Sequence, residues 1–273
     1  MRKVLITGAS GFVGLHVLRN LIMKGVDVSV VARPNSVGKF MDLYAIQLAE
    51  SATPFLESEE WWTKVLTGID TVIHLAWYAE PGKYLMADEN LDCLTGTITI
   101  ARAAANAGVR RFIGIGTCFE YDVSVGWLSV DTPLKPLTPY AASKASAYLT
   151  LSQWFRAREI EFSWCRLFYL YGEGEHDRRF VPYLRRSLAA GLPAELTAGM
   201  QVRDFLDVAD AAEAICNVAF GSSVGPVNVC SGMPITIRAF AERIADEYGR
   251  RDLLKFGVRE ENIFDPPVVV GIK

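Results

Sequence analysis

The sequence predicts an α/β fold: a doubly wound parallel sheet followed by a smaller α/β C-terminal substrate domain. Three observations predict it. Short apolar runs alternate regularly with stretches of helical periodicity, a glycine-rich turn joins the first run to the first helix, and polar or aromatic residues follow the runs at their carboxyl ends. The chain has 273 residues, 51% of them hydrophobic and 22% charged, which suffices for a packed core and excludes disordered and fibrous classes.

Composition also limits the class of partner. The formal net charge is −3 and no long basic run occurs, so nucleic acid is not an expected partner. No apolar run approaches the ~20 residues of a membrane helix, and the N-terminus leads directly into a strand without room for a signal peptide. We expect a cytoplasmic protein with reduced thiols and no metal, because five cysteines without metal-like spacing are present: Cys93, Cys118, Cys165, Cys216 and Cys230.

The first strand, turn and helix predict a dinucleotide site. Val4 to Ile6 is an apolar run, and a helical pattern follows until Gly25. Gly8 permits a tight turn, Gly11 lets the backbone approach a diphosphate, and Gly14 lets the helix pack on the strand. The helix N-terminus then offers free N–H groups to the phosphates. The expected cofactor-binding residues of this turn are Gly8, Ser10, Gly11, Phe12, Val13 and Gly14.

The second strand, Asp27 to Arg33, bears on the choice of cofactor. An acidic residue at its end would accept a hydrogen bond from the ribose 2′-OH of NAD, but Ala32 and Arg33 stand there. An arginine suits a 2′-phosphate, so NADP(H) is favoured over NAD(H). The alternative is a solvated Arg33 without a ligand.

Further strands are expected at 52–56, 71–77, 111–117 and 162–170, with helices from Ser58, over 88–107 and from Pro139. Trp61, Trp62 and Val65 should form the buried side of the first of these helices. His74 is interpreted as a packing residue at a strand end. Residues that follow the strands lie at the carboxyl edge of the sheet, where open α/β folds bind ligands.

Thr117, Tyr140 and Lys144 are the candidate catalytic residues. A tyrosine and a lysine four residues apart share one helix face, so an ammonium can stand near a phenol. Because an unperturbed tyrosine has a pKa of ~10, a fixed positive charge would make its phenolate usable nearer neutral pH. Thr117 ends a predicted strand and is delivered to the same sheet edge.

Gly8-x-x-Gly11-x-x-Gly14, the strand-end Thr117 and Tyr140-x-x-x-Lys144 together resemble the extended short-chain dehydrogenase/reductase superfamily. The resemblance is to its NAD(P)-dependent nucleotide-sugar epimerase, dehydratase and ketoreductase family, with a Rossmann-type domain. It spans essentially the whole chain. Further matching stretches are His74-Leu-Ala76, Arg166 to Gly172, Arg203-Asp-Phe-Leu-Asp207-Val and Asn228 to Gly232.

The resemblance implies roles for single residues. Tyr140 would be the acid/base at the reacting oxygen, Thr117 would hydrogen-bond that oxygen, and Lys144 would hold the nicotinamide ribose and lower the tyrosine pKa. Arg203 would bind the nucleotide diphosphate; its alternative is a structural pair with Asp204 or Asp207. Leu75 and Ala76 would line the cofactor. The expected substrate-binding residues are Trp77, Tyr78, Cys118, Phe119, Tyr169, Arg179 and Arg203.

Departures from the family pattern narrow the reaction. Sugar 4,6-dehydratases of the family carry two acidic residues directly after the threonine, where this chain has Cys118 and Phe119. Glu120 comes one position late, so dehydration is disfavoured unless a bulge re-aims it. Tyr169 replaces a customary asparagine. Cys93 replaces another, for which Asn90, one turn earlier, is a candidate substitute.

The expected function is an NADP(H)-dependent oxidoreductase of a nucleoside-diphosphate sugar, specifically a 4-ketoreductase of an NDP-4-keto-6-deoxyhexose. An NAD-dependent NDP-sugar 4-epimerase is the alternative, and a non-catalytic NADP(H)-binding sensor or scaffold is a further one. The resemblance also implies a homodimer. Residues 1–170 and 204–231 would form the dinucleotide-binding domain, and residues 171–203 and 232–273 the substrate-binding domain.

Overall fold

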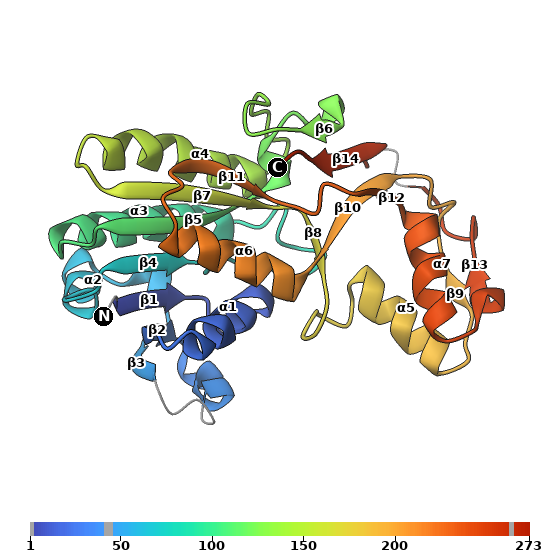
Figure 1. The fold of residues 1–273 in the computed structure, drawn as a ribbon, viewed down its shortest axis with the longest axis horizontal. Helices are drawn as coiled ribbons and strands as arrows, with labels where there is room; N and C mark the ends of the chain where they lie inside the picture. The colour runs from blue at the N-terminus through green and yellow to red at the C-terminus, as the bar shows by residue number, and fades with distance from the viewer. Residues whose placement is uncertain (1–2, 41–45, 262–264) are drawn as a thin grey trace.

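The computed structural model describes residues 3–40, 46–261 and 265–273. A seven-stranded sheet in the order β11-β7-β5-β4-β1-β2-β3 forms its larger part, and every neighbouring pair is parallel (Figure 1). This confirms the predicted doubly wound α/β fold. The strands are β1 (Lys3–Thr7), β2 (Asp27–Ala32), β3 (Ile46–Glu50), β4 (Thr71–His74), β5 (Arg111–Thr117), β7 (Glu161–Leu167) and β11 (Gly225–Val229).

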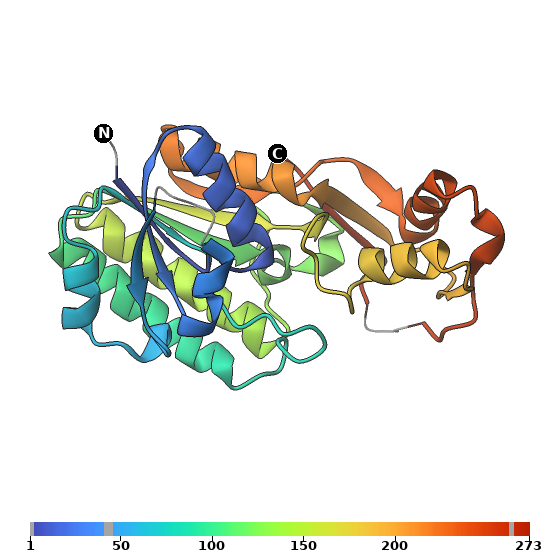
Figure 2. The ribbon, with the colours of Figure 1, turned by 90° about the horizontal axis from the view of Figure 1, so that it is seen from below.

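Helices cover both faces of this sheet, as Figure 2 shows. On one face lie α1 (Phe12–Met23) and α6 (Val208–Phe220); on the other lie α2 (Glu59–Val65), α3 (Glu89–Asn106) and α4 (Pro139–Arg156). The first strand supplies side chains to both cores: Val4 and Ile6 pack in one, and Leu5 in the other. Burial on both faces explains why this strand is a continuous apolar run rather than an alternating one.

The expected third strand at 52–56 is wrong. The strand is β3, which pairs with β2 from Ile46 to Glu50, whereas Pro54–Leu56 form a short 3₁₀ turn, η2. Pro54 has no N–H to donate to a ladder, which disfavours a strand there. The turn packs on α3 at Gly96, where an added Cβ would lie 2.6 Å from the Phe55 ring. Another 3₁₀ segment, η1 (Pro34–Phe40), follows β2.

The remaining helix predictions are close to the structure. Ser58 caps α2 by accepting from the Trp61 N–H, and Trp62 is fully buried. The fourth strand ends at His74, three residues earlier than expected. The sixth expected strand divides in two: β7 ends at Leu167, and β8 (Tyr169–Tyr171) leaves the main sheet for a second one.

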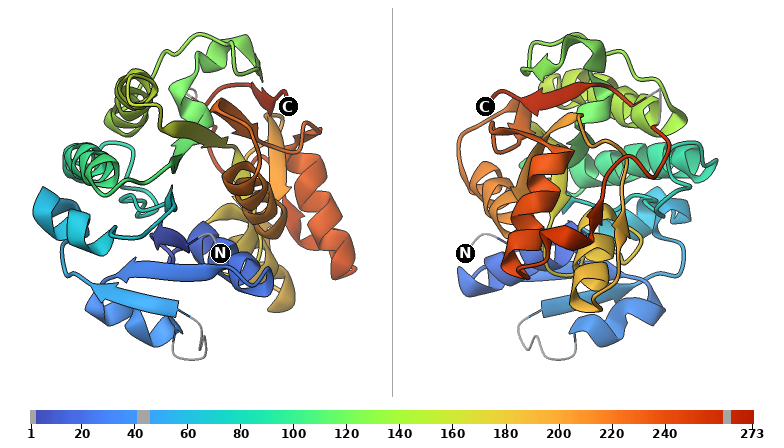
Figure 3. Two further views of the ribbon diagram at one scale, coloured as in Figure 1. Left: turned by 60° about the vertical axis from the view of Figure 1, so that its left-hand side comes forward. Right: turned by 90° about the vertical axis from the view of Figure 1, so that its right-hand side faces the viewer.

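The second sheet has the order β12-β10-β14-β6, and β8 also pairs with β10. Its strands are β12 (Pro234–Thr236), β10 (Val202–Asp207), β14 (Val268–Gly271) and β6 (Trp127–Leu128). Helices α5 (Phe180–Ala189) and α7 (Ile237–Glu247) pack beside it with the small pair β9 (Ala194–Glu195) and β13 (Leu254–Lys255), the end that faces the viewer in the right-hand view of Figure 3.

The return to the main sheet differs from the expectation. The segment 204–231 is expected to belong to the domain of the main sheet, but residues 202–207 lie in the second sheet, and the return is made by α6 and β11. The domain limits themselves stay a prediction. Short 3₁₀ segments complete the chain: η3 (Cys118–Glu120), η4 (Val123–Val125) and η5 (Arg251–Leu253). Within the described ranges, no helix has both the length and the apolar character to cross a membrane.

Candidate active site

The glycine turn has the geometry of a phosphate cradle. Gly8 has φ +73°, and a Cβ there would lie 2.6 Å from the Ala76 nitrogen; a Cβ on Gly14 would lie 2.1 Å from the Gly8 carbonyl oxygen. Gly11 is the N-cap of α1 and supplies no side-chain cap. Backbone can therefore approach a ligand at the start of α1, where the helix dipole favours an anion. The turn fits the diphosphate of a dinucleotide.

The predicted cofactor residues that follow β4 lie beside this turn. The Leu75 N–H donates to the Thr7 carbonyl (3.2 Å), and the Ala76 N–H donates to the Thr7 hydroxyl (3.3 Å). Arg33 follows the end of β2 and is exposed. Lys39 of η1, which the sequence did not single out, donates to the Ser10 carbonyl (3.0 Å). Two cations therefore stand on the β2 side of the cradle.

Thr117 is held by a capping box at the end of β5. Its side chain accepts from the Phe119 N–H (3.3 Å), and the Glu120 carboxylate accepts from the Thr117 N–H (2.8 Å). Glu120 is 0% exposed and forms an ion pair with Arg166 (2.7 Å). No bulge turns Glu120 toward the sheet edge; its carboxylate points into the core. The Glu120 carboxylate is therefore not presented at the sheet edge.

Tyr140 stands in the first turn of α4. Thr138 caps this helix by accepting from the Ala141 N–H, and Pro139 occupies the first helical position. The Tyr140 ring is half-buried, with Tyr84 edge-on at 4.8 Å and Trp77 at 6.4 Å. Burial raises the pKa of Tyr140 well above its usual value, as do Tyr84 and Glu120, while a hydrogen bond with Thr117 acts to lower it. Thr117 and Tyr140 are thus close enough to interact.

Lys144 lies one helical turn beyond Tyr140 on α4, and its side chain is buried. Its ammonium donates to the Ile115 carbonyl (2.5 Å) and lies 3.8 Å from the centroid of the Trp77 ring. Burial lowers the pKa of Lys144 to about 7, partly offset by Glu120 and Cys93. The sequence led us to expect a lowered pKa at Tyr140; in the structure the lysine carries the lowered pKa, because desolvation outweighs the charges near both groups.

His74 is a packing residue, as expected. Its Nδ1 lies 2.7 Å from the Thr7 hydroxyl, and its Nε2 lies 2.9 Å from the Thr97 hydroxyl. Burial, and then the charge of Lys144, lower the pKa of His74 to about 3. A neutral imidazole clamped between two threonines links β1, β4 and α3 and carries no free ring nitrogen to the sheet edge.

Asn90 fixes the segment that follows β4. Its side chain is fully buried, donates to the carbonyls of Tyr84 (2.7 Å) and Ala87 (2.8 Å), and accepts from the Trp77 indole (2.9 Å). Cys93 accepts from the Tyr78 N–H (3.3 Å). The Asn90 amide is therefore engaged within the protein, and it holds Trp77 and Tyr84 beside Tyr140.

Four of the predicted substrate residues lie together: Cys118, Phe119, Tyr169 and Arg203. Arg179 lies apart from them. Cys118 is buried, which raises the pKa of its thiol to about 12, and Phe119 lies edge-on to Tyr169 at 6.1 Å. Arg203 lies over the Tyr169 ring at 5.3 Å. Arg179 is exposed at the start of α5, with its guanidinium 5.4 Å from the Tyr84 ring. The Tyr169 hydroxyl is buried without a hydrogen-bond partner.

Sequence reasoning assigned no role to three residues that support Tyr140 and Glu120. The Tyr84 ring contacts Tyr140, and Trp164 and Arg166 bind Glu120. A signal for the role of Glu120 was present, because Thr117-x-x-Glu120 is the spacing of a capping box. No comparable spacing marks Tyr84, whose position depends on how the segment after β4 folds back on α4.

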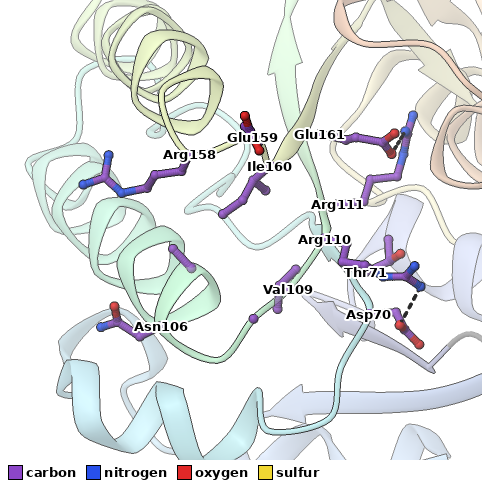
Figure 4. A pocket seen from close by; sticks show the side chains of 12 residues that line it. Asp70, Thr71, Asn106, Val109, Arg110, Arg111, Arg158, Glu159, Ile160 and Glu161 are labelled. Carbon is purple, nitrogen blue, oxygen red and sulfur yellow. Dashed lines mark hydrogen bonds and ion pairs between the residues drawn. The ribbon is translucent and has the colours of Figure 1, made fainter.

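A hollow also lies away from these residues. A pocket of about 800 Å³ opens at the amino ends of β4, β5 and β7, at the opposite edge of the sheet. Figure 4 shows its side chains, in which Arg110 pairs with Asp70 and Arg111 with Glu161. Both arginines are paired with carboxylates, and the pocket lies at the edge of the sheet away from the phosphate cradle, so we do not place a site there. Among the described residues, no cluster of His, Cys, Asp or Glu could hold a metal ion.

The parallel sheet, the phosphate cradle and the meeting of Thr117, Tyr140 and Lys144 at one sheet edge define a Rossmann-type protein of the extended short-chain dehydrogenase/reductase class. The chain belongs to the NAD dependent epimerase/dehydratase family, whose sequence model matches residues 4–229.

Known proteins with similar sequence or structure belong to the same class. The chain is 24% identical over 277 residues to a dTDP-6-deoxy-L-talose 4-dehydrogenase (NAD(+)) of Aggregatibacter actinomycetemcomitans, covering 99% of this chain and 100% of the relative. It is similar to a UDP-N-acetylglucosamine 4-epimerase from Methanobrevibacter ruminantium (TM-score 0.85, 23% identity, 99% of this chain and 89% of the other). A Thermus thermophilus UDP-glucose 4-epimerase in complex with NAD gives a TM-score of 0.78 at 22% identity, covering 99% and 90%.

Proposed function

We propose that the protein is an NADP(H)-dependent oxidoreductase of a nucleoside-diphosphate sugar, namely a 4-ketoreductase of an NDP-4-keto-6-deoxyhexose. One observation carries the proposal: Thr117 stands close enough to Tyr140 at the carboxyl edge of the sheet to act on its hydroxyl, while Glu120 is turned into the core. Such a site has groups for moving one proton at one oxygen. Cys118 and Phe119 follow Thr117 directly, and Glu120 is buried, so no carboxylate of this segment is placed for removing water.

The residues would act on a carbonyl oxygen beside the cradle. A bound nicotinamide dinucleotide supplies the hydride, and the chain supplies alignment and the proton. Tyr140 donates the proton as negative charge develops on the oxygen, and Thr117 donates a second hydrogen bond. The raised pKa of Tyr140 keeps the phenol protonated at neutral pH, which suits reduction. Lys144 would hold the ribose and stabilise the phenolate that remains.

The relatives support this reading in part. The full-length match is to a protein named for dehydrogenation at C4 of a dTDP-6-deoxyhexose, the reverse of ketone reduction at the same carbon. That relative is named for NAD(+), whereas Arg33 at the end of β2 favours NADP(H). The proposal of NADP(H) therefore rests on Arg33, with Lys39 beside the cradle as a second cation.

The activity is tested by absorbance at 340 nm with NADPH or NADH and a panel of dTDP- and UDP-4-keto-6-deoxyhexoses. We expect consumption of the reduced cofactor with at least one sugar, and a rate lowered at least about 100-fold by Tyr140→Phe, since general acid catalysis contributes roughly 10²–10⁴-fold. Tyr248→Phe, at the end of α7, is the matched control and should keep the rate. Failure to consume cofactor with every sugar would reject the proposal.

Arg33→Ala tests the cofactor choice separately. Loss of a guanidinium paired with a 2′-phosphate should weaken NADPH binding roughly tenfold or more and leave NADH binding within about twofold. Titration of cofactor fluorescence measures both. Equal losses for the two cofactors would remove the assignment of Arg33 to the 2′-phosphate.

An NAD-dependent 4-epimerase is the second candidate, because two of the solved neighbours are 4-epimerases of UDP sugars. Such an enzyme would interconvert UDP-glucose and UDP-galactose, or their N-acetyl forms, without net cofactor turnover. Mass spectrometry of the purified protein would find bound NAD, and chromatography of the sugars would find both epimers. A sensor or scaffold is a third candidate; it would bind cofactor and give neither reaction.

We further propose a homodimer through α3 and α4, since Leu91 and Leu149 are exposed on these helices. Light scattering of the wild type and of Leu91→Glu/Leu149→Glu tests it, and an unchanged monomer mass in both would reject it. We also propose the two domains with the limits 1–170 and 204–231, and 171–203 and 232–273, and a cytoplasmic location in keeping with the described cysteines, all free.

A further inference from the structure

Glu120 is a fully buried carboxylate beside the candidate active site. Its Oε1 accepts from the Thr117 N–H (2.8 Å) and from the Trp164 indole (2.9 Å), and its Oε2 accepts from Arg166 Nε (2.7 Å). The side chain is 0% exposed. A buried charge is costly unless it is paired and hydrogen-bonded, and this one has both kinds of partner.

The sequence of β5 makes room for this carboxylate. A Cβ on Gly116 would lie 2.3 Å from Glu120 Oε1 and 2.2 Å from Trp164 Nε1, and a Cβ on Gly114 would lie 2.3 Å from the Trp164 ring. The two glycines therefore let the Trp164 indole lie across β5 and meet Glu120. The pattern Gly-Ile-Gly-Thr thus builds a pocket for the carboxylate directly before Thr117.

Arg166 connects the carboxylate to other elements. Its Nη1 donates to the Tyr121 hydroxyl (2.9 Å), which in turn donates to Asn228 of β11 (2.8 Å). The guanidinium lies 4.5 Å from the centroids of both Tyr121 and Tyr148. Tyr148 is on α4, two turns beyond Tyr140. The network therefore joins the end of β5 to the helix that carries the catalytic candidates.

We propose that Glu120 is a positioning residue of the active site: its carboxylate fixes the backbone of Thr117, and it binds the Trp164 indole, whose ring lies 5.9 Å from the Lys144 ammonium. The inference rests on the proposed function for its catalytic meaning. Its physical content, an anion that acts on Lys144 and a clamp on Thr117, is measurable without any substrate.

The charge effect has a defined direction. An anion favours the protonated forms of its neighbours, and Glu120 acts to raise the pKa of both Lys144 and Tyr140. Removal of its charge should therefore release the proton of Lys144 at a lower pH. Other ionisable groups around Lys144, Tyr140 and Glu120 come from several elements. They are His74 on β4, Tyr84 in the segment after β4, Cys93 on α3, Cys118 in η3 and Arg166 on β7.

The experiment uses Trp77 as the reporter, because the Lys144 ammonium lies 3.8 Å from its ring. The fluorescence of Trp77 is obtained by subtracting the emission of the Trp77→Phe form from that of each protein, and it is followed from pH 5 to 9. We expect a midpoint near the Lys144 pKa of about 7 in the wild type. In Glu120→Gln, which keeps the shape of the side chain, the midpoint should fall by roughly half a pH unit or more.

Hydrogen exchange of the peptide 113–121 measures the clamp. We expect faster exchange in Glu120→Ala than in Glu120→Gln, because the glutamine oxygen can still accept from the Thr117 N–H. Glu161→Gln is the matched control, since Glu161 pairs with the buried Arg111 at the other end of β5 and β7. It should leave both the midpoint and the exchange at 113–121 unchanged.

If Glu120→Gln does not fold because Arg166 is left unpaired, Glu120→Gln/Arg166→Met removes both charges and is measured instead. A Trp77 midpoint that stays at the wild-type value in the folded variant overturns the charge effect, and unchanged exchange in Glu120→Ala overturns the clamp. With an active wild type, kcat at pH 7 should fall about tenfold in Glu120→Gln while KM stays within about twofold. A wild type without activity on any sugar rejects the proposed function and leaves the two physical readouts to decide this inference.

Discussion

Arg203 is ion-paired with Asp265, at 2.7 Å between Arg203 Nη2 and Asp265 Oδ2. The sequence offered Asp204 or Asp207 as its structural partner, and both are wrong. Asp204 accepts from the N–H groups of Ser231, Gly232 and Gly271, and Asp207 caps α6. Arg203 is 2% exposed and Asp265 32% exposed, so the carboxylate lies on the accessible side of the guanidinium. A diphosphate would have to share Arg203 with Asp265.

This arrangement predicts opposite effects of two substitutions. Asp265→Asn should strengthen the binding of dTDP or UDP about three- to tenfold, because the guanidinium no longer has a competing anion. Arg203→Met should weaken binding at least tenfold. Isothermal titration calorimetry measures both, with Asp252→Asn as a control that breaks the exposed pair with Arg250. Weaker nucleotide binding in Asp265→Asn would show that Asp265 positions Arg203 rather than competing for it.

Gly14 is predicted to be intolerant of any side chain. Its Cβ would lie 2.1 Å from the Gly8 carbonyl oxygen and 2.8 Å from the Ala9 Cα, both backbone atoms that cannot turn away. Gly14→Ala should lower the melting temperature by several degrees and weaken cofactor binding, because α1 would move off β1. Gly38→Ala in η1 meets nothing within 4 Å and is the control. A Gly14→Ala protein with wild-type melting and cofactor affinity would contradict the close packing.

Asn90 is predicted to set the order of the segment that carries Tyr84. Asn90→Ala removes three partly buried hydrogen bonds and leaves two carbonyls and an indole N–H to be satisfied otherwise. We expect a loss of about 2–4 kcal/mol in the free energy of unfolding, at a net worth of about 1 kcal/mol for each bond. Asn106→Ala, on the same helix but exposed with one bond to Glu59, should cost less than about 1 kcal/mol. Urea denaturation compares the two.

The sheet and its cofactor edge were predictable because local patterns determine them. Gly8 and Gly14 mark the cradle through their spacing, and Thr117 ends an apolar run at the residue where β5 ends. Contacts between distant segments were not predictable. Nothing near Arg203 in the sequence points to Asp265, and nothing near Tyr140 points to Tyr84; both pairs form only when separate loops fold together. Glu120 was expected to face away from the sheet edge unless a bulge re-aimed it, but its role as part of the cap at Thr117 was not recognised, although the spacing signalled one.

His74 predicts how stability responds to acid. Its pKa is lowered to about 3 in the folded protein from 6.5, so below pH 6.5 the unfolded chain binds a proton that the folded protein does not. The folded state is therefore favoured above pH 6.5 and loses stability as the pH falls toward 3. With about 1.4 kcal/mol for each pH unit, the loss from His74 between pH 6.5 and pH 5 is about 2 kcal/mol.

His74→Gln keeps a donor and an acceptor for Thr7 and Thr97 but does not titrate, so its free energy of unfolding should fall by about 2 kcal/mol less than that of the wild type over this range. Urea titrations at pH 7, 6 and 5 measure this difference, and His16→Gln, on the opposite face of the sheet, should keep the wild-type decline. An equal decline in His74→Gln would mean that His74 accepts a proton in the folded protein, and the clamp between the two threonines would then have to open.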